Sequence, residues 1–312
     1  MKTDVPASAT SDRQLVVGRA GRLDEWLLAS APAERLAALR ILIGGFVLVY
    51  VVANVTEFSR IAAQPSSPFE PVGVAGVLTS PVDGAFVWAL FVALLISGVA
   101  FVAGAAFRVS GPLFAVFTLI WASYHSSWGQ LLHFEHLFTL HLLVLAASPA
   151  AAAWSFDARR RPKLSPDVRF GWPIRLLAIT TAVTYSLAAV AKIRESGLDW
   201  IDGSTLGNHV AYSATRIDLL GGLDPPLASL VVGRPWLVAP MATVALVIEL
   251  LAPVALIGDR ARNVWVVLAL LFHAATAATM MVWFPYQGLG FAMLPLFRVE
   301  LSPIGAALRR RL

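Results

Sequence analysis

The sequence predicts an all-α, polytopic transmembrane helical bundle, with seven or eight membrane helices and a capping region in an outer loop. Three observations support this fold class. Hydrophobic residues make up 58% of the 312 positions, and the mean hydropathy is +0.72. Only 14% of the residues are charged, whereas a soluble domain carries about 25%. The apolar residues also occur in blocks long enough to cross a bilayer.

These apolar blocks define the expected membrane helices. A straight helix needs roughly 20 apolar residues to cross about 30 Å of hydrocarbon. Residues 287–298 are too short to do so alone, and they leave the number of crossings at seven or eight. The predicted spans are residues 36–57, 85–107, 111–127, 132–149, 173–193, 236–257 and 262–283.

The distribution of basic residues predicts the orientation of these spans. With the N-terminus inside and eight crossings, 19 of the 24 lysines and arginines fall on the inner side. The positive-inside rule then predicts a multi-pass protein of the inner (plasma) membrane with both termini in the cytoplasm. The net charge of +5 follows this topology and does not indicate a nucleic-acid partner.

The same topology divides the chain into a membrane domain and two flanking segments. Residues 1–34 are expected to form a cytoplasmic tail with a short amphipathic interfacial helix, and residues 35–298 the transmembrane domain. Residues 299–312 form a basic cytoplasmic tail. A loop as long as residues 194–235 is uncommon unless it has a role, so we expect it to form short helices that cap the outer side.

Six ionisable residues are expected on the membrane helices. His125 lies at the end of the third apolar run, His133 and His136 begin the fourth, and Lys192 ends the fifth. Glu249 and His273 lie near the middle of later ones. Such groups are costly at membrane depth and are best satisfied by facing one shared interior space. Simpler alternatives are open. Lys192 could extend to the headgroups, Glu249 could be protonated or hold an arginine, and His273 could bond a neighbouring helix.

No metal site is predicted. His133 and His136 are three residues apart and share a helix face, but a metal ion needs three or four ligands. The absence of cysteine excludes disulfides, thiolate nucleophiles and cysteine-ligated zinc or iron–sulfur sites.

Three other polar residues have local predicted roles. His141 is expected to make a hydrogen bond between helices. Asp157 is expected to pair with Arg159 or its neighbour, just inside the membrane. Asp202 is expected to cap a helix that begins near Ser204.

Three stretches of the chain carry a resemblance to a known family. Residues 188–203 place Lys192 at a helix end, before a short spacer and a Trp-hydrophobic-acid-Gly turn. Glu135-His-Leu-Phe is followed by Trp154-Ser-Phe-Asp157, and Leu271-Phe-His-Ala by the aromatic stretch 283–286. Together these resemble the vitamin K-dependent gamma-carboxylases. The start of the first helix is similar to the bacterial members, the HTTM (horizontally transferred transmembrane) family.

The resemblance implies an activity on a reduced naphthoquinone, a menaquinol-like molecule, with O2 and in some members CO2. In the family a lysine acts as the base on the quinol, and an alkoxide forms and collapses to an epoxide. By the match, Lys192 is the base and His136 its helper. His273, Glu249, Trp200 and His133 are expected to surround the quinone.

The chain departs from the animal carboxylases in two ways. It resembles the bacterial short form, without their large extramembrane β-rich part. The family's asparagine before the histidine is Glu135 here. Carboxylation of a protein is therefore less strongly implied than the quinone chemistry.

Whether the protein is an enzyme stays open at this point. It could instead be a non-catalytic quinone- or lipid-binding membrane subunit that assists a partner. A transporter is disfavoured because the sequence has no inverted repeat. The expected partners are membrane lipid, the quinone, and a peptide or protein substrate at the outer cap. Lys192 distinguishes the enzyme from the binding subunit. A catalytic base needs the lysine amine, whereas a binding scaffold does not.

Overall fold

The computed structural model describes residues 21, 24–65, 68–303 and 305–307. Within these residues the fold is all-α, and the single β contact is an isolated antiparallel bridge between Ala31 and Asp167. The predicted fold class, a helical membrane bundle, is confirmed.

The helices follow the apolar blocks of the sequence. The larger ones in the described part of the chain are α2 (Ala33–Ala53), α3 (Val55–Ala62), α4 (Gly84–Ala103), α5 (Phe107–Ser126), α6 (His133–Ala146), α7 (Val168–Ser196), α9 (Ser204–Leu219), α11 (Pro235–Leu250) and α12 (Asp259–Met280). Shorter helices and 3-10 turns connect them: η1 (Gly73–Val77), α8 (Leu198–Ile201), α10 (Ala228–Val231), η2 (Ala252–Leu256), α13 (Pro285–Gly288), η3 (Phe291–Leu296) and η4 (Val299–Leu301).

Four described helices, α2, α4, α7 and α12, are long and apolar enough to cross a membrane by length and composition. α11 is apolar but has 16 residues, and the chain then continues through η2. α6 has 14 residues, which at about 1.5 Å per residue is short of the roughly 30 Å of hydrocarbon. The number of seven or eight crossings therefore stays a prediction.

Several helix boundaries differ from those expected, and two of the helices show this most clearly. The predicted span 36–57 is divided at Asn54, where α2 ends and α3 begins. The Asn54 side chain donates to the Tyr50 carbonyl (2.8 Å) and so competes with the regular helix pattern. In contrast, α7 extends beyond the predicted 173–193 at both ends. It begins after Asp167, whose carboxylate accepts from the Arg169 N–H (2.9 Å) as an N-cap.

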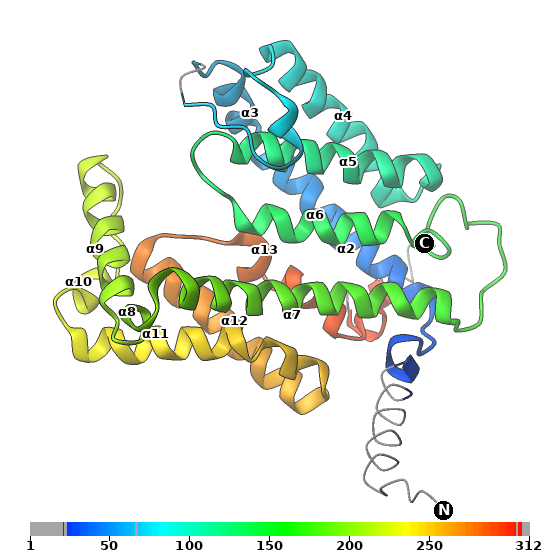
Figure 1. Ribbon diagram of the computed structural model, residues 1–312. Coiled ribbons are helices and arrows are strands. Elements are labelled where there is room, and N and C mark those ends of the chain that lie inside the picture. The colour runs from blue at the N-terminus through cyan, green and yellow to red at the C-terminus, as the bar shows by residue number, and fades with distance from the viewer. Residues whose placement is uncertain (1–20, 22–23, 66–67, 304, 308–312) are drawn as a thin grey trace, which may run out of the picture.

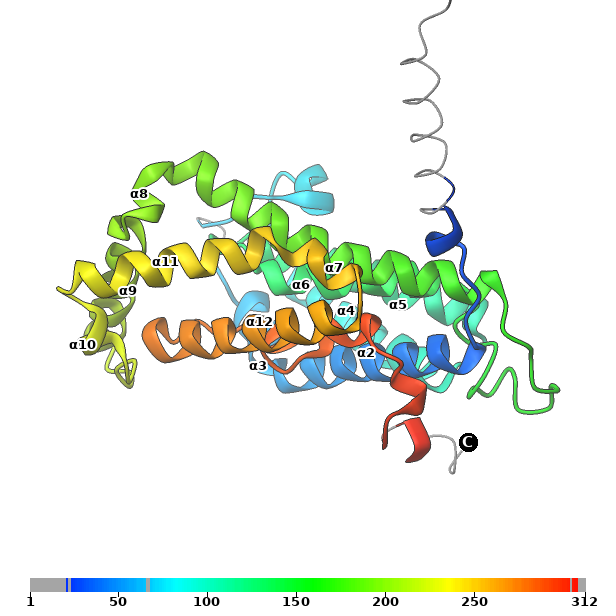
Figure 2. The ribbon, with the colours of Figure 1, turned by 90° about the horizontal axis from the view of Figure 1, so that it is seen from below.

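The helices form two packed groups (Figures 1 and 2). In the first group α2 packs against α4 and α6, and α5 lies between α4 and α6. In the second group, α11 and η2 pack along α7, and α12 packs against α11 and η2. Contacts of α7 with α2 and α6 join the groups. α9 stands across the end of α7 rather than alongside it (Figure 1).

The opposite end, where α2, α7 and α12 begin, is here called the basic end. It is held by the fully buried guanidinium of Arg40, which donates to the carbonyls of Phe101 (2.8 Å), Val102 (2.7 Å) and Trp154. Two of these carbonyls belong to the last turn of α4, where intrahelical partners are missing. Arg40 thereby joins α2, α4 and the segment after α6.

Asp157 has a different role from the one predicted. Its carboxylate accepts from the backbone N–H groups of Ala106 (3.0 Å) and Phe107 (2.8 Å) and so caps α5. The prediction that it pairs with Arg159 is wrong, because the unsatisfied N–H groups of a helix start compete for a nearby carboxylate. The segment Trp154-Ser-Phe-Asp157 therefore has a structural role. It connects to α2 through the bond from Arg40 to Trp154, and to α5 through Asp157.

The predicted interfacial helix over residues 22–34 is described in part. Residues 24–27 are helical, and the Trp26 carbonyl accepts from Arg175 Nε (2.8 Å). Residues 1–20 and 22–23 lie outside the described residues, as do Arg309, Arg310 and Arg311 of the predicted basic tail.

The orientation is testable because the chain has no native cysteine. A cysteine at Arg160, which is exposed near the basic end, is expected to resist a membrane-impermeant thiol reagent in intact cells. A cysteine at Asp218, exposed on α9, is expected to react. Labelling is measured before and after permeabilisation, which serves as the control for reactivity. The opposite labelling pattern would invert the predicted topology.

Candidate functional site

Lys192 and Glu249 form an ion pair between α7 and α11. Lys192 Nζ lies 2.7 Å from each of the two carboxylate oxygens of Glu249. The side chains are 23% and 5% exposed, so the carboxylate is almost fully removed from solvent. Glu249 therefore holds a lysine, whereas the sequence suggested protonation or an arginine partner. A pair this buried is held together because separating it would leave an uncompensated charge.

The ring of Trp200 covers this pair. The Lys192 ammonium lies 5.2 Å from the ring centroid, within range of a cation–π contact. The indole N–H donates to the Ala242 carbonyl on α11 (3.2 Å) and so fixes the ring. Ala189 and Ala242 are fully buried beside it, and their small side chains allow α7 and α11 to approach closely.

The turn after Trp200 requires a glycine at position 203. Gly203 has φ +85°, a left-handed conformation that side chains disfavour, and a Cβ there would lie 2.6 Å from the Ala239 backbone nitrogen. Asp202 accepts from the Ser204 N–H (2.7 Å) where α9 begins, so its predicted capping role is confirmed. The Trp-hydrophobic-acid-Gly motif thus places an aromatic ring on the lysine and turns the chain into α9.

His273 lies on α12, in the same helix group as Lys192. Its Nε2 lies 2.6 Å from the Tyr185 hydroxyl on α7, so it bonds a neighbouring helix as the simpler alternative expected. Its Nδ1 is buried and has no hydrogen-bond partner among the described residues. His273 therefore combines a structural bond with one unused polar atom.

His133 and His136 lie at the start of α6. Both are exposed, and their ring centroids are 6.3 Å apart, which agrees with the shared helix face. Among the described residues, however, no hydrogen bond joins Lys192 to His136. The predicted partnership of Lys192 and His136 is therefore not a direct contact, and it stays a prediction.

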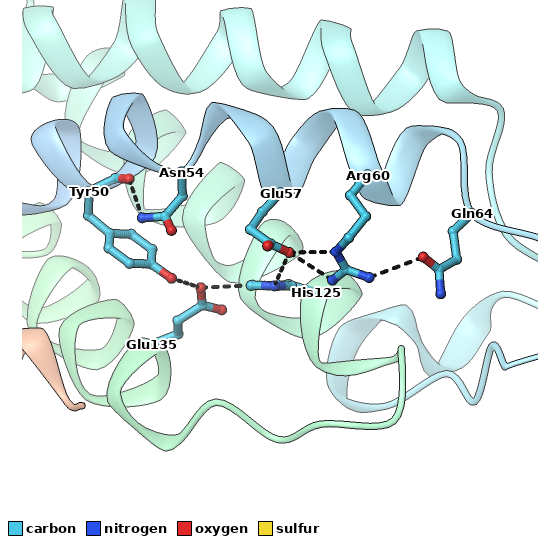
Figure 3. A network of polar contacts seen from close by, with 7 residues as sticks. All are labelled: Tyr50, Asn54, Glu57, Arg60, Gln64, His125 and Glu135. Atoms are coloured by element: carbon cyan, nitrogen blue, oxygen red, sulfur yellow. Dashed lines mark hydrogen bonds and ion pairs between the residues drawn. The ribbon is translucent and has the colours of Figure 1, made fainter. Parts of the chain in front are cut away.

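A second polar network lies near the start of α6 (Figure 3). The sequence analysis did not predict this network. The fully buried Glu135 carboxylate accepts from the Tyr50 hydroxyl (2.7 Å) and lies 2.9 Å from His125 Nδ1. His125 Nε2 lies 3.9 Å from Glu57, which is bonded to the exposed Arg60 (2.7 Å). The network joins α2, α3, α5 and α6. The sequence signals were the polar run between the third and fourth apolar blocks, Glu135 close after it, and Glu57 at the end of the first block.

Glu135 and His136 are neighbours with different environments. Consecutive residues of a helix point about 100° apart, and here Glu135 is fully buried whereas His136 is exposed. Glu135 therefore serves the network in Figure 3 and not the surface that carries His136.

His141 is a further buried polar residue of the bundle. Its Nδ1 lies 2.6 Å from the Tyr286 hydroxyl, and its Nε2 lies 3.3 Å from Thr181 on α7. The predicted bond between helices is confirmed. Among the described residues, no group of three histidine, aspartate or glutamate side chains is placed to hold a metal ion.

The fold and this site define a multi-pass helical membrane protein with a charged pair buried between two of its helices. The chain belongs to the family of the HTTM domain, whose model matches residues 29–300. That match includes α2 to α12 and every residue of the site. No curated protein and no solved structure matches the chain significantly.

Proposed function

We propose that the protein is a membrane enzyme of the carboxylase-like type, which takes a proton from a reduced naphthoquinone and oxygenates its ring. The observation that carries the proposal is the Lys192–Glu249 pair beneath Trp200. Acid–base groups removed from solvent and lying beside an aromatic surface are what proton abstraction from an aromatic alcohol requires.

The proton balance limits how the pair can act. As an ammonium, Lys192 cannot accept a proton. Transfer of one proton from Nζ to Glu249 leaves a neutral amine and a neutral carboxyl group, which avoids two buried charges. The amine then accepts the proton of the substrate hydroxyl, and the electron pair stays on the substrate oxygen. Glu249 is therefore the group that makes the amine available.

The surrounding residues fit a flat ligand with two ring oxygens. Trp200 offers an aromatic face next to the amine, and His273 offers a buried nitrogen without a partner. His133 and His136 could bond the second oxygen from α6. A reduced naphthoquinone supplies two electrons, so that one atom of O2 enters the epoxide and the other leaves as water.

The direct test uses the purified full-length protein in detergent, with a prenylated naphthohydroquinone and oxygen. We expect oxygen-dependent formation of the epoxide, measured by chromatography, and none under nitrogen. Labelled bicarbonate and a glutamyl peptide, added in a parallel reaction, test coupled carboxylation and a peptide substrate at the α8–α10 cap. Absence of epoxide in every reaction would contradict the proposed activity.

A second function is favoured by the same ion pair. Because both oxygens of Glu249 engage Lys192, the pair could serve only to hold α7 against α11 in a non-catalytic quinone- or lipid-binding subunit. A naphthoquinone that co-purifies with the protein but is never converted would support this function. Failure to bind any quinone or lipid would contradict both.

A further inference from the structure

A cavity of about 300 Å³ lies at the basic end, far along α7 from Lys192. It is lined by residues from α2, α7, η2, α12 and η3, and from the segments before α2 and after η3. Its most unusual feature is that four arginines face it: Arg35, Arg175, Arg262 and Arg298.

Two of these arginines are neutralised within the protein. Arg35 donates to both carboxylate oxygens of Glu300, at 3.0 and 2.8 Å. Arg262 is paired with Asp259 at 2.7 Å. Arg175 and Arg298, in contrast, have no carboxylate partner among the described residues. The cavity therefore carries two positive charges that the described part of the chain does not balance.

Arg175 is held in place although it lacks an acidic partner. Its Nε donates to the Trp26 carbonyl (2.8 Å), and its guanidinium lies 5.4 Å from the Trp26 ring centroid. The two terminal nitrogens are then free to donate to a ligand. Arg175 lies seven residues after the start of α7, about 10 Å along the helix.

An apolar cavity of about 510 Å³ adjoins the basic one. The two share Asp259, Arg262, Phe297 and Arg298. Beyond these, the second cavity is lined mainly by apolar side chains, such as Leu42 on α2 and Leu294 on η3. A basic cavity continuous with an apolar one matches a molecule with a phosphate at one end and hydrocarbon at the other.

We infer that this pair of cavities binds one anionic phospholipid. Arg175 and Arg298 bond its phosphate, and an acyl chain lies along Leu42 and Leu294. Basic pockets between membrane helices bind anionic headgroups in this way, and guanidinium groups suit phosphate because they donate two parallel hydrogen bonds. The proposal is independent of the chemistry at Lys192.

The test measures retention of phosphatidylglycerol by the full-length protein in detergent, by native mass spectrometry and by the lipid-induced rise in melting temperature. The double variant Arg175→Gln/Arg298→Gln is expected to bind the lipid roughly thirtyfold more weakly, at about a tenfold loss per 1.4 kcal/mol and about 1 kcal/mol per basic residue. The matched control, Arg108→Gln/Arg160→Gln, removes two exposed charges near the same end and should bind as the wild type does.

Further measurements separate the possible sources of phosphate. Phosphatidylcholine should bind more weakly than phosphatidylglycerol, and inorganic phosphate should not displace the bound lipid. Equal binding of both lipids, or equal losses in the two double variants, would overturn the proposal. Displacement by millimolar inorganic phosphate would overturn it as well, because the site would then hold free phosphate rather than a lipid.

Discussion

Replacement of Lys192 by alanine is expected to lower the oxygen-dependent conversion of a reduced naphthoquinone by roughly 10²- to 10⁴-fold, the usual contribution of a general base. Lys192→Arg is expected to lose as much activity, because a guanidinium stays protonated and cannot accept the substrate proton. The arginine should nevertheless keep the ion pair, since a guanidinium can bond both oxygens of Glu249.

The two variants therefore separate catalysis from stability. Epoxide formation and melting temperature are measured on the same preparations. Lys192→Arg should be inactive and melt like the wild type, whereas Lys192→Ala should be inactive and less stable because it leaves Glu249 buried without its partner. Arg194→Gln is the control, since Arg194 is 79% exposed and, within the described part of the chain, is bonded only to exposed Glu195. Full activity of Lys192→Arg would show that the lysine serves only as the charge partner of Glu249.

The largest loss of stability is expected for Arg40→Met. Methionine fills a similar space but donates no hydrogen bond, so the carbonyls of Phe101, Val102 and Trp154 lose their charged donor. Hydrogen bonds to charged groups contribute about 1.5–3 kcal/mol each, and losing even two of these three predicts a loss of about 3 kcal/mol or more in unfolding free energy. The midpoint of thermal or denaturant unfolding in detergent measures this.

Arg108→Met provides the matched comparison. Arg108 lies near the same end, on α5, but is exposed. We expect its replacement to change the midpoint little, as surface substitutions usually do. Equal effects of the two substitutions would contradict the structural role assigned to Arg40.

The fold was largely predictable because the hydrophobic blocks and the basic asymmetry depend on the bilayer and not on the details of packing. The break at Asn54 was not, because it depends on one side chain bonding the Tyr50 carbonyl within a continuous apolar run. The length of α6 was overestimated for a related reason. The predicted span 132–149 extends past both ends of α6, because hydropathy does not indicate where a helix begins or ends.

The members of the site were easier to predict than their pairing. Lys192 and Glu249 each stand out as charges in apolar runs, but they are 57 residues apart, and only the packing of α7 on α11 brings them together. Asp157 was misassigned because sequence proximity favoured Arg159, whereas the backbone of α5 approaches from 50 residues away. Glu135 was noted only as a departure from the family. Its partners Tyr50 and His125 belong to other helices.

Arg40 also has a consequence for biosynthesis. α2 is the first long apolar helix in the described chain to leave the ribosome, and it carries a charge whose acceptors lie 61 and 114 residues later. An arginine without partners is costly in hydrocarbon, so we expect the newly made helix to keep Arg40 at the headgroup level. Once residues 101–154 have been synthesised, their carbonyls can draw the helix to its final depth. Placement of α2 at its final depth is thus a late step in assembly, because it depends on the synthesis of the helices that follow it.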